Sequence, residues 1–193
     1  MTAAKGVRLG ALSEGLARQT GGSLLVAGSP RTPAPAADAL RAELAVPNFC
    51  YRWGDPGDNP YRAMLALADA YVVTGESMSM LAEAADTQRP LFIFDPGDAG
   101  PWWRYPHNYR YKPLSHRLAM SLGPRRMRRD VGRIQHALVG GGRARWLDER
   151  TIADAAALVS AAGERREETR APGSGEDELR GTAQLVRRLA APR

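Results

Sequence analysis

Two hydrophobic patterns alternate along the N-terminal half of the chain. Short apolar runs predict buried strands at 23–27, 49–53, 70–73 and 91–94. Apolar residues three and four positions apart predict the intervening helices, at 7–19, 35–45, 60–68 and 77–86. Strands that alternate with helices in this way are typical of a parallel sheet covered by helices. The predicted fold class is therefore α/β, with a Rossmann-like parallel sheet flanked by helices.

The periodicity weakens after Phe94. Residues 95–112 are rich in aromatic residues, proline and glycine, and are expected to form a loop. Further helices are predicted at 113–121, 125–139 and 151–164. We expect residues 1–164 to form one α/β domain with a basic helical extension at about 101–150. Residues 165–193 are expected to form a flexible linker and a short terminal helix.

Length and cysteine content limit the class of protein. The chain has 193 residues, enough for one domain with appendages. Cys50 is its single cysteine, which excludes an internal disulfide and fits a reducing compartment. No run approaches the roughly 18 apolar residues of a membrane span, and the N-terminus lacks the apolar core of a signal peptide. We therefore expect a soluble, cytoplasmic protein.

Positive charge is concentrated in one stretch. The net charge is +6, and residues 101–150 carry 12 basic and 3 acidic side chains. The densest group of basic residues consists of Arg125, Arg126, Arg128, Arg129 and Arg133, followed by Arg143 and Arg145. This group is interpreted either as a solvated helix face or as a contact for an anionic membrane surface. Nucleic acid is disfavoured as a partner because no stacking aromatics interrupt the cluster.

The chemistry of the chain is expected where the third strand becomes a helix. The segment from Thr74 to Ser77 lies at this junction, and ligands of open parallel sheets gather outside the carboxyl ends of the strands. A helix N-terminus offers unpaired N–H groups and a partial positive charge, which suit a phosphate. Gly75 permits close backbone approach, and the hydroxyl of Ser79 adds a donor. The alternative is that Ser77 is a plain N-cap and the nearby Glu83 a solvated helix residue.

No metal site is predicted. The histidines His107, His116 and His136 show no ligand spacing with one another or with Cys50. No order of serine, histidine and aspartate supports a hydrolase either. The sequence therefore identifies no catalytic residue.

Three separated motifs carry a family resemblance. The segment from Ala68 to Ala84 resembles the signature of the elongated-mitochondria (mitochondrial fission) family of glycosyltransferase-like proteins. The blocks Ser29-Pro30-Arg31-Thr32-Pro33 and Asn59-Pro60-Tyr61 agree with that family in order and spacing. The resemblance covers roughly residues 20–125. It implies the fold of the C-terminal, donor-binding half of a GT-B glycosyltransferase.

The resemblance also implies a set of substrate-binding residues. Ser29, Arg31 and Thr32 would face the donor phosphates, and Arg31 would supply charge-assisted hydrogen bonds. The turn at Trp53 and Gly54 would lie near the nucleobase. The pocket for the phosphates would be lined by Gly75, Ser77, Ser79 and Met80, and Glu83 would bind the ribose. Two positions depart from the family pattern: Pro30 stands in place of an arginine, and Glu76 in place of a common aspartate.

The implied function is binding of a nucleoside diphosphate sugar as the donor substrate of a glycosyltransferase, with no metal or other cofactor required. A GT-B enzyme also needs an N-terminal acceptor domain, and this chain begins almost directly at the second half. Three alternatives stay open: a fragment, a chain that works with a partner supplying the N-terminal domain, or a protein without transferase activity. The main competing hypothesis is a non-catalytic interaction protein that uses its basic face to contact a partner or membrane.

Overall fold

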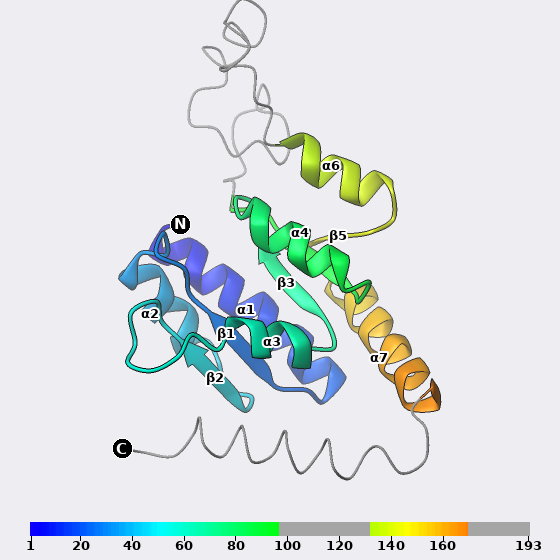
Figure 1. The fold of residues 1–193 in the computed structure, drawn as a ribbon, viewed down its shortest axis with the longest axis horizontal. Helices are drawn as coiled ribbons and strands as arrows, with labels where there is room; N and C mark the ends of the chain where they lie inside the picture. Colours follow the sequence, from blue (N-terminus) through cyan, green and yellow to red (C-terminus); the bar gives the residue numbers. More distant parts are fainter. Residues whose placement is uncertain (97–131, 170–193) are drawn as a thin grey trace, which may run out of the picture.

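A computed structural model describes residues 1–96 and 132–169 of the chain, with the helices and strands labelled in Figure 1. The helices are α1 (Ala3–Thr20), α2 (Ala34–Ala42), α3 (Tyr61–Leu67), α4 (Met78–Asp86), α6 (Gly132–Gly140) and α7 (Ile152–Thr169). The strands are β1 (Leu24–Ala27), β2 (Asn48–Tyr51), β3 (Tyr71–Thr74), β4 (Leu91–Phe94) and β5 (Arg145–Leu147).

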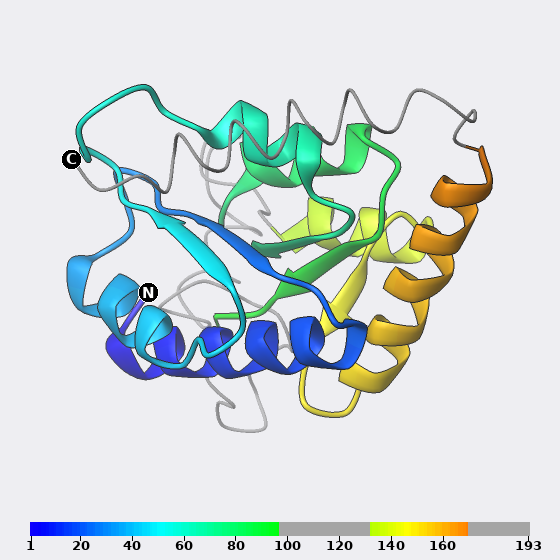
Figure 2. The same cartoon turned by 90° about the horizontal axis from the view of Figure 1, so that it is seen from below.

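Among residues 1–96 and 132–169, all strand pairs are parallel, and they form two small sheets. In the first sheet β1 pairs with β2, so that Val26 lies opposite Cys50. In the second sheet the order is β3-β4-β5. Every residue of β4 is buried, as expected for a central strand that is covered on both faces. The strands of both sheets run through the middle of the molecule, with helices on either side (Figure 2).

Two hydrophobic clusters fill the space between sheets and helices. On one face, Phe92 and Phe94 pack with the apolar residues of α1, α2 and α7, and Val26 and Val72 border the same cluster. This first cluster therefore joins the two sheets. On the other face, the neighbouring β4 residues Leu91 and Ile93 pack with α4, and α6 borders them. The alternation along β4 directs successive side chains to opposite clusters.

The predicted α/β class is confirmed, as parallel strands in two small sheets flanked by helices. The strand predicted at 91–94 matches β4, and Gly21 ends α1 in the left-handed conformation with φ of 64°. In α4, Ala84 and Ala85 are buried with Leu81, whereas Ala82 is exposed. Leu81, Ala84 and Ala85 are three and four positions apart, which is the spacing of one face of a helix.

The C-terminal part contains a strand that the sequence did not reveal. The three residues of β5 are too short a run to stand out, and pairing with β4 is what makes them a strand. Helix α7 extends to Thr169, past the boundary expected at 164. The helix predicted at 113–121 lies outside the described residues. Within the described ranges, no helix is both long and apolar enough to cross a membrane.

Candidate functional site at the carboxyl edge of the strands

The loops after β1 and β2 lie next to each other. The Gly28 N–H donates to the Tyr51 carbonyl at 2.8 Å, which continues the strand pairing into the loops. A Cβ atom at Gly28 would lie 3.3 Å from that same oxygen, so the close approach favours glycine. The predicted phosphate-facing turn and the Trp53 turn are therefore neighbours at one edge of the first sheet.

The turn after β1 uses two of its predicted ligand residues to hold itself together. The Thr32 hydroxyl accepts from the Ser29 N–H at 3.0 Å, and the two hydroxyls lie 3.2 Å apart. Arg31 is exposed, and its guanidinium makes no hydrogen bond or ion pair with any described residue. Of this block, Arg31 is thus the side chain that is free to meet an anion.

The turn after β2 presents an aromatic side chain to solvent. Trp53 is 57% exposed, and Gly54 has a φ of 94°, a conformation that glycine adopts without strain. Asp55 accepts from the Arg52 N–H at 2.8 Å and closes the turn. The turn therefore has the shape and the exposed ring that stacking on a base would need.

The loop between β3 and α4 is buried at its base. Gly75 donates to the Phe94 carbonyl at 2.9 Å, and Ser77 donates to the Thr74 carbonyl at 2.9 Å. Ser77 is the N-cap residue of α4, but its side chain makes no capping hydrogen bond. Among the described residues, no acceptor meets the backbone N–H groups of Glu76, Met78, Ser79 or Met80. Helix α4 therefore begins with its first-turn donors unpaired.

The other predicted residues of α4 divide between surface and core. Ser79 and Glu83 are exposed, whereas Met80 is partly buried against the second cluster. Met80 can therefore offer its backbone N–H to a ligand, and its side chain belongs to the core. Burial and a hydrogen bond to the Glu83 carboxylate together raise the pKa of Tyr61. This contact joins the Asn59-Pro60-Tyr61 block to helix α4.

A residue that the sequence did not single out reaches the same loop. Gln135 of α6 is completely buried, and its amide Nε2 donates to the Gly75 carbonyl. Its Oε1 has no hydrogen-bond partner among the described residues, and Nε2 lies 4.0 Å from the Met78 sulfur. A signal existed, because Gln135 stands three and four positions before Leu138 and Val139, which border the core. A glutamine at an apolar position is a candidate for a specific polar role.

An ion pair occupies the ends of β4 and β5. The Arg8 guanidinium donates twice to Glu149, at 2.8 Å from Nε and 3.0 Å from a terminal nitrogen, and lies 5.5 Å from the centre of the Phe94 ring. The hydrogen bond from Arg8 lowers the pKa of Glu149 to about 2. Arg8 and Glu149 thus pair with each other and are not available to a ligand. The loops after β1, β2 and β3 are the open part of the carboxyl edge of the strands.

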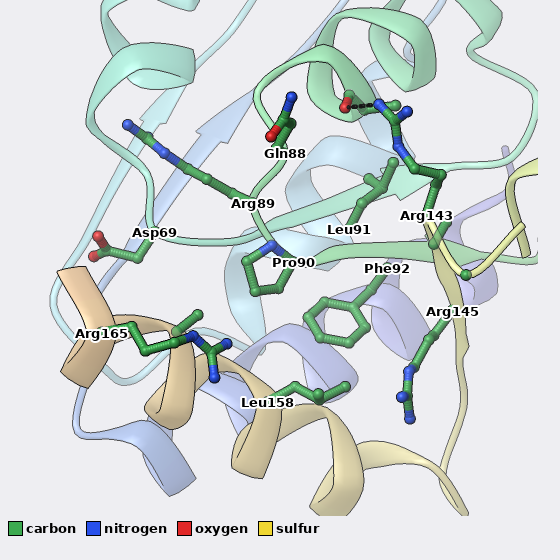
Figure 3. A pocket seen from close by; sticks show the side chains of 14 residues that line it. Asp69, Gln88, Arg89, Pro90, Leu91, Phe92, Arg143, Arg145, Leu158 and Arg165 are labelled. Carbon is green, nitrogen blue, oxygen red and sulfur yellow. Dashed lines mark hydrogen bonds between the residues drawn. The ribbon is translucent and has the colours of Figure 1, made fainter.

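A cavity lies at the opposite edge, where β4 and β5 begin (Figure 3). Its volume is about 790 Å³, and its lining includes Arg89, Arg143, Arg145 and Arg165. Arg89 donates to the Ala66 and Ala68 carbonyls at the end of α3, and Arg143 donates to the Ala85 carbonyl of α4 at 2.7 Å. These two arginines stabilise the carbonyl ends of helices. Their positive charge therefore has a structural role.

Several residues that the sequence singled out lie outside the described residues or away from the carboxyl edge of the strands. The cluster Arg125, Arg126, Arg128 and Arg129 and the residues His107 and His116 lie outside the described ranges. Arg133 and Arg145 are exposed. The ring of His136 meets that of Trp146 edge-on, with centroids 6.0 Å apart. Within residues 1–96 and 132–169, no three histidine, cysteine, aspartate or glutamate side chains are grouped as metal ligands.

Comparison with known proteins gives one consistent relationship. The family model described as "Mitochondrial fission ELM1" matches residues 1–111 of the chain. A protein of Arabidopsis thaliana named "Mitochondrial fission protein ELM1" is 36% identical over 74 residues, which are 38% of this chain and 17% of that protein. The match thus spans about a sixth of the length of that curated relative. No solved structure matches the chain.

Proposed function

This chain belongs to the mitochondrial fission ELM1 family, and on that premise we propose that the carboxyl edge of its strands binds the diphosphate of a nucleotide-sugar. The part of the edge involved comprises the loops after β1, β2 and β3. In this proposal the domain corresponds to the donor-binding half of a GT-B glycosyltransferase. A complete transferase would require an acceptor-binding half in addition.

The start of α4 is the observation that carries the proposal. The N–H groups of Glu76, Met78, Ser79 and Met80 have no acceptor among the described residues, and the Ser77 hydroxyl does not cap them. Unpaired donors and the helix dipole together favour an anion at this position. A diphosphate has enough oxygens to accept from several of these groups at once, which a single carboxylate could not do.

The surrounding residues supply complementary contacts. Arg31 is exposed at the same edge and would add a charge-assisted hydrogen bond to the phosphates. Trp53 would stack on the nucleobase. Glu83, which accepts from Tyr61, would accept from the ribose hydroxyls. The loops after β1 and β3, which would hold the phosphates, lead to helices on opposite faces of the strands. Leu40 of α2 belongs to the first hydrophobic cluster, and Leu81 of α4 belongs to the second. Such a divergence creates a crevice for ligands in open α/β sheets.

In a transfer reaction, these residues would act on the leaving group. As the bond between the sugar and the diphosphate breaks, negative charge accumulates on the diphosphate oxygens. The unpaired N–H groups of α4 and the guanidinium of Arg31 would stabilise that charge. Glu83 would orient the donor and move no proton. The acceptor and the group that deprotonates it would come from outside the described residues.

Direct titration tests the proposal. We expect uridine or guanosine diphosphate to bind the purified chain, and Arg31→Ala to weaken binding by about tenfold, since a hydrogen bond to a charged group contributes about 1.5–3 kcal/mol. Arg145→Ala is the matched control, because it removes the same charge at the opposite edge and leaves the affinity unchanged. Isothermal titration calorimetry gives both affinities.

Two outcomes would contradict the proposal. One is that the wild-type chain binds neither diphosphate, which would favour the interaction-protein hypothesis. The other is that Arg31→Ala and Arg145→Ala weaken binding equally, which would indicate a general response to net charge. A fall confined to Arg31→Ala supports a site at the carboxyl edge.

A further inference from the structure

We infer that Gln135 of α6 is a positioning residue, which orients the Gly75–Glu76 peptide so that its N–H faces the bound diphosphate. This inference rests on the proposed function. It assigns a role at the site to a helix outside residues 1–111, the part that the family model matches. The observations that carry it are one buried hydrogen bond and the planarity of a peptide.

The orientation of the Gln135 amide is determined by its partner. The Gly75 carbonyl can only accept, so the Gln135 amide must present its NH2 group to it. Gln135 is completely buried, and within the part of the chain that the structure describes its Oε1 has no hydrogen-bond partner. A buried amide oxygen without a partner destabilises the fold. An apolar residue would avoid that cost, so the presence of glutamine points to the value of the donated hydrogen bond.

That hydrogen bond fixes the direction of the next N–H group. The described peptides contain no cis bond, and in a trans peptide the C=O and N–H point in opposite directions. Because the Gly75 carbonyl points toward Gln135, the Glu76 N–H points away from α6. Gly75 is further held by its own N–H, which donates to the Phe94 carbonyl at 2.9 Å. Both sides of Gly75 are therefore anchored, to β4 and to α6.

The Glu76 N–H then joins the unpaired donors at the start of α4. It has no acceptor among the described residues, as is also the case for Met78 and Ser79. Without Gln135 the Gly75–Glu76 peptide would be free to rotate, since glycine has few conformational restrictions. A rotated peptide would place a carbonyl oxygen where a phosphate needs a donor. Gln135 thus prevents an arrangement that would repel the ligand.

The test compares Gln135→Met, which keeps a similar length and removes the donor, with Gln19→Met on the exposed surface of α1. Uridine diphosphate and guanosine diphosphate are titrated beside uridine and guanosine. We expect Gln135→Met to weaken diphosphate binding by about tenfold, the effect of one hydrogen bond to a charged group. Nucleoside affinity is expected to stay unchanged, and Gln19→Met should behave like the wild type. Equal losses for diphosphate and nucleoside, or no loss for either, would overturn the inference.

A second variant covers the case in which Gln135→Met does not fold. In Gln135→Glu the side chain can donate to the Gly75 carbonyl only when it is protonated. Relative to wild type, its diphosphate affinity should therefore recover as the pH is lowered. A constant ratio across pH would count against the positioning role.

A measurement without ligand separates this inference from the proposed function. In the folded variant, the backbone order parameter of Glu76 should fall from about 0.85, typical of rigid backbone, toward about 0.6. Equal order parameters in wild type and variant would overturn the positioning role, whatever binds. Failure of the wild-type chain to bind any diphosphate would instead overturn the proposed function.

Discussion

Glu14 turns inward from α1, and its carboxylate links this helix to the backbone at residues 45 and 46. It accepts from the Arg18 guanidinium at 2.7 Å and from the N–H groups of Ala45 and Val46 at 3.0 Å each. The Glu14 side chain is only 10% exposed. The hydrogen bond from Arg18, followed by those from the backbone, lowers the pKa of Glu14. The ionised form therefore stabilises the link between α1 and the segment that leads to β2.

Replacing Glu14 tests this link through its pH dependence. A carboxyl whose pKa is lowered by folding stabilises the protein above its ordinary pKa of 4.5, and that contribution is lost as the pH falls through the folded value. We therefore expect Glu14→Gln to lower the melting temperature at pH 7, and the difference from wild type to shrink in acid. Thermal unfolding across pH measures both effects. Glu164→Gln, at an exposed position of α7, should show neither. A difference that persists undiminished in acid would contradict this role.

The close contact between α1 and α2 depends on two glycines. A Cβ atom at Gly6 would lie 2.2 Å from the Ala36 carbonyl oxygen, and one at Gly10 would lie 2.6 Å from that of Leu40. Both obstacles are backbone atoms, which cannot move without shifting α2. Helix propensity alone would favour alanine at either position by about 1 kcal/mol. The packing of the two helices decides against it.

We expect Gly6→Ala to destabilise the fold by about 1–3 kcal/mol, the usual effect of overpacking. The control is Gly163→Ala in α7, where no atom lies within 4 Å of the added Cβ. That change should stabilise the protein by roughly 0.5–1 kcal/mol, through propensity and the lower entropy of the unfolded chain. Urea unfolding of the two variants gives both free energies. A stabilising effect of Gly6→Ala would contradict the close contact of α1 with α2.

In the described part of the molecule, the two sheets share no strand pairing and are joined by side chains. Leu12 of α1 is 4% exposed and lies in the first cluster, which Val26 of β1 and Val72 of β3 both border. The connection is therefore hydrophobic and runs through α1. Such a connection makes the stability of each sheet depend on the other.

We expect Leu12→Ala to destabilise the whole molecule by about 2–5 kcal/mol, as cavities in a core do. Amide hydrogen exchange should then accelerate in β1 and in β4 together. Val7→Ala, on the exposed side of α1, should change stability by no more than about 0.5 kcal/mol. Faster exchange in the first sheet alone would show that the two sheets unfold independently.

The sequence by itself determined the local structure and the place of the motifs. Periodicity predicted β4 and the order of the helices and strands that precede it. The segment from Thr74 to Ser77 was likewise placed between a strand and a helix by its pattern alone. These features depend on residues close together in the sequence, because the side chains of a helix repeat about every 3.6 residues and those of a strand every two.

Only the tertiary structure decided which distant residues meet. The strand β5 exists because β4 lies beside it, and Gln135 reaches Gly75 across a sequence separation of 60 residues. The inward turn of Glu14 and the contact of Tyr61 with Glu83 were equally absent from the pattern. Whether a polar side chain is solvated or bonded depends on its burial and on the partner that the fold brings to it. Sequence spacing does not record that partner, and so the proposed donor site could be located from the sequence but its buried contacts could not.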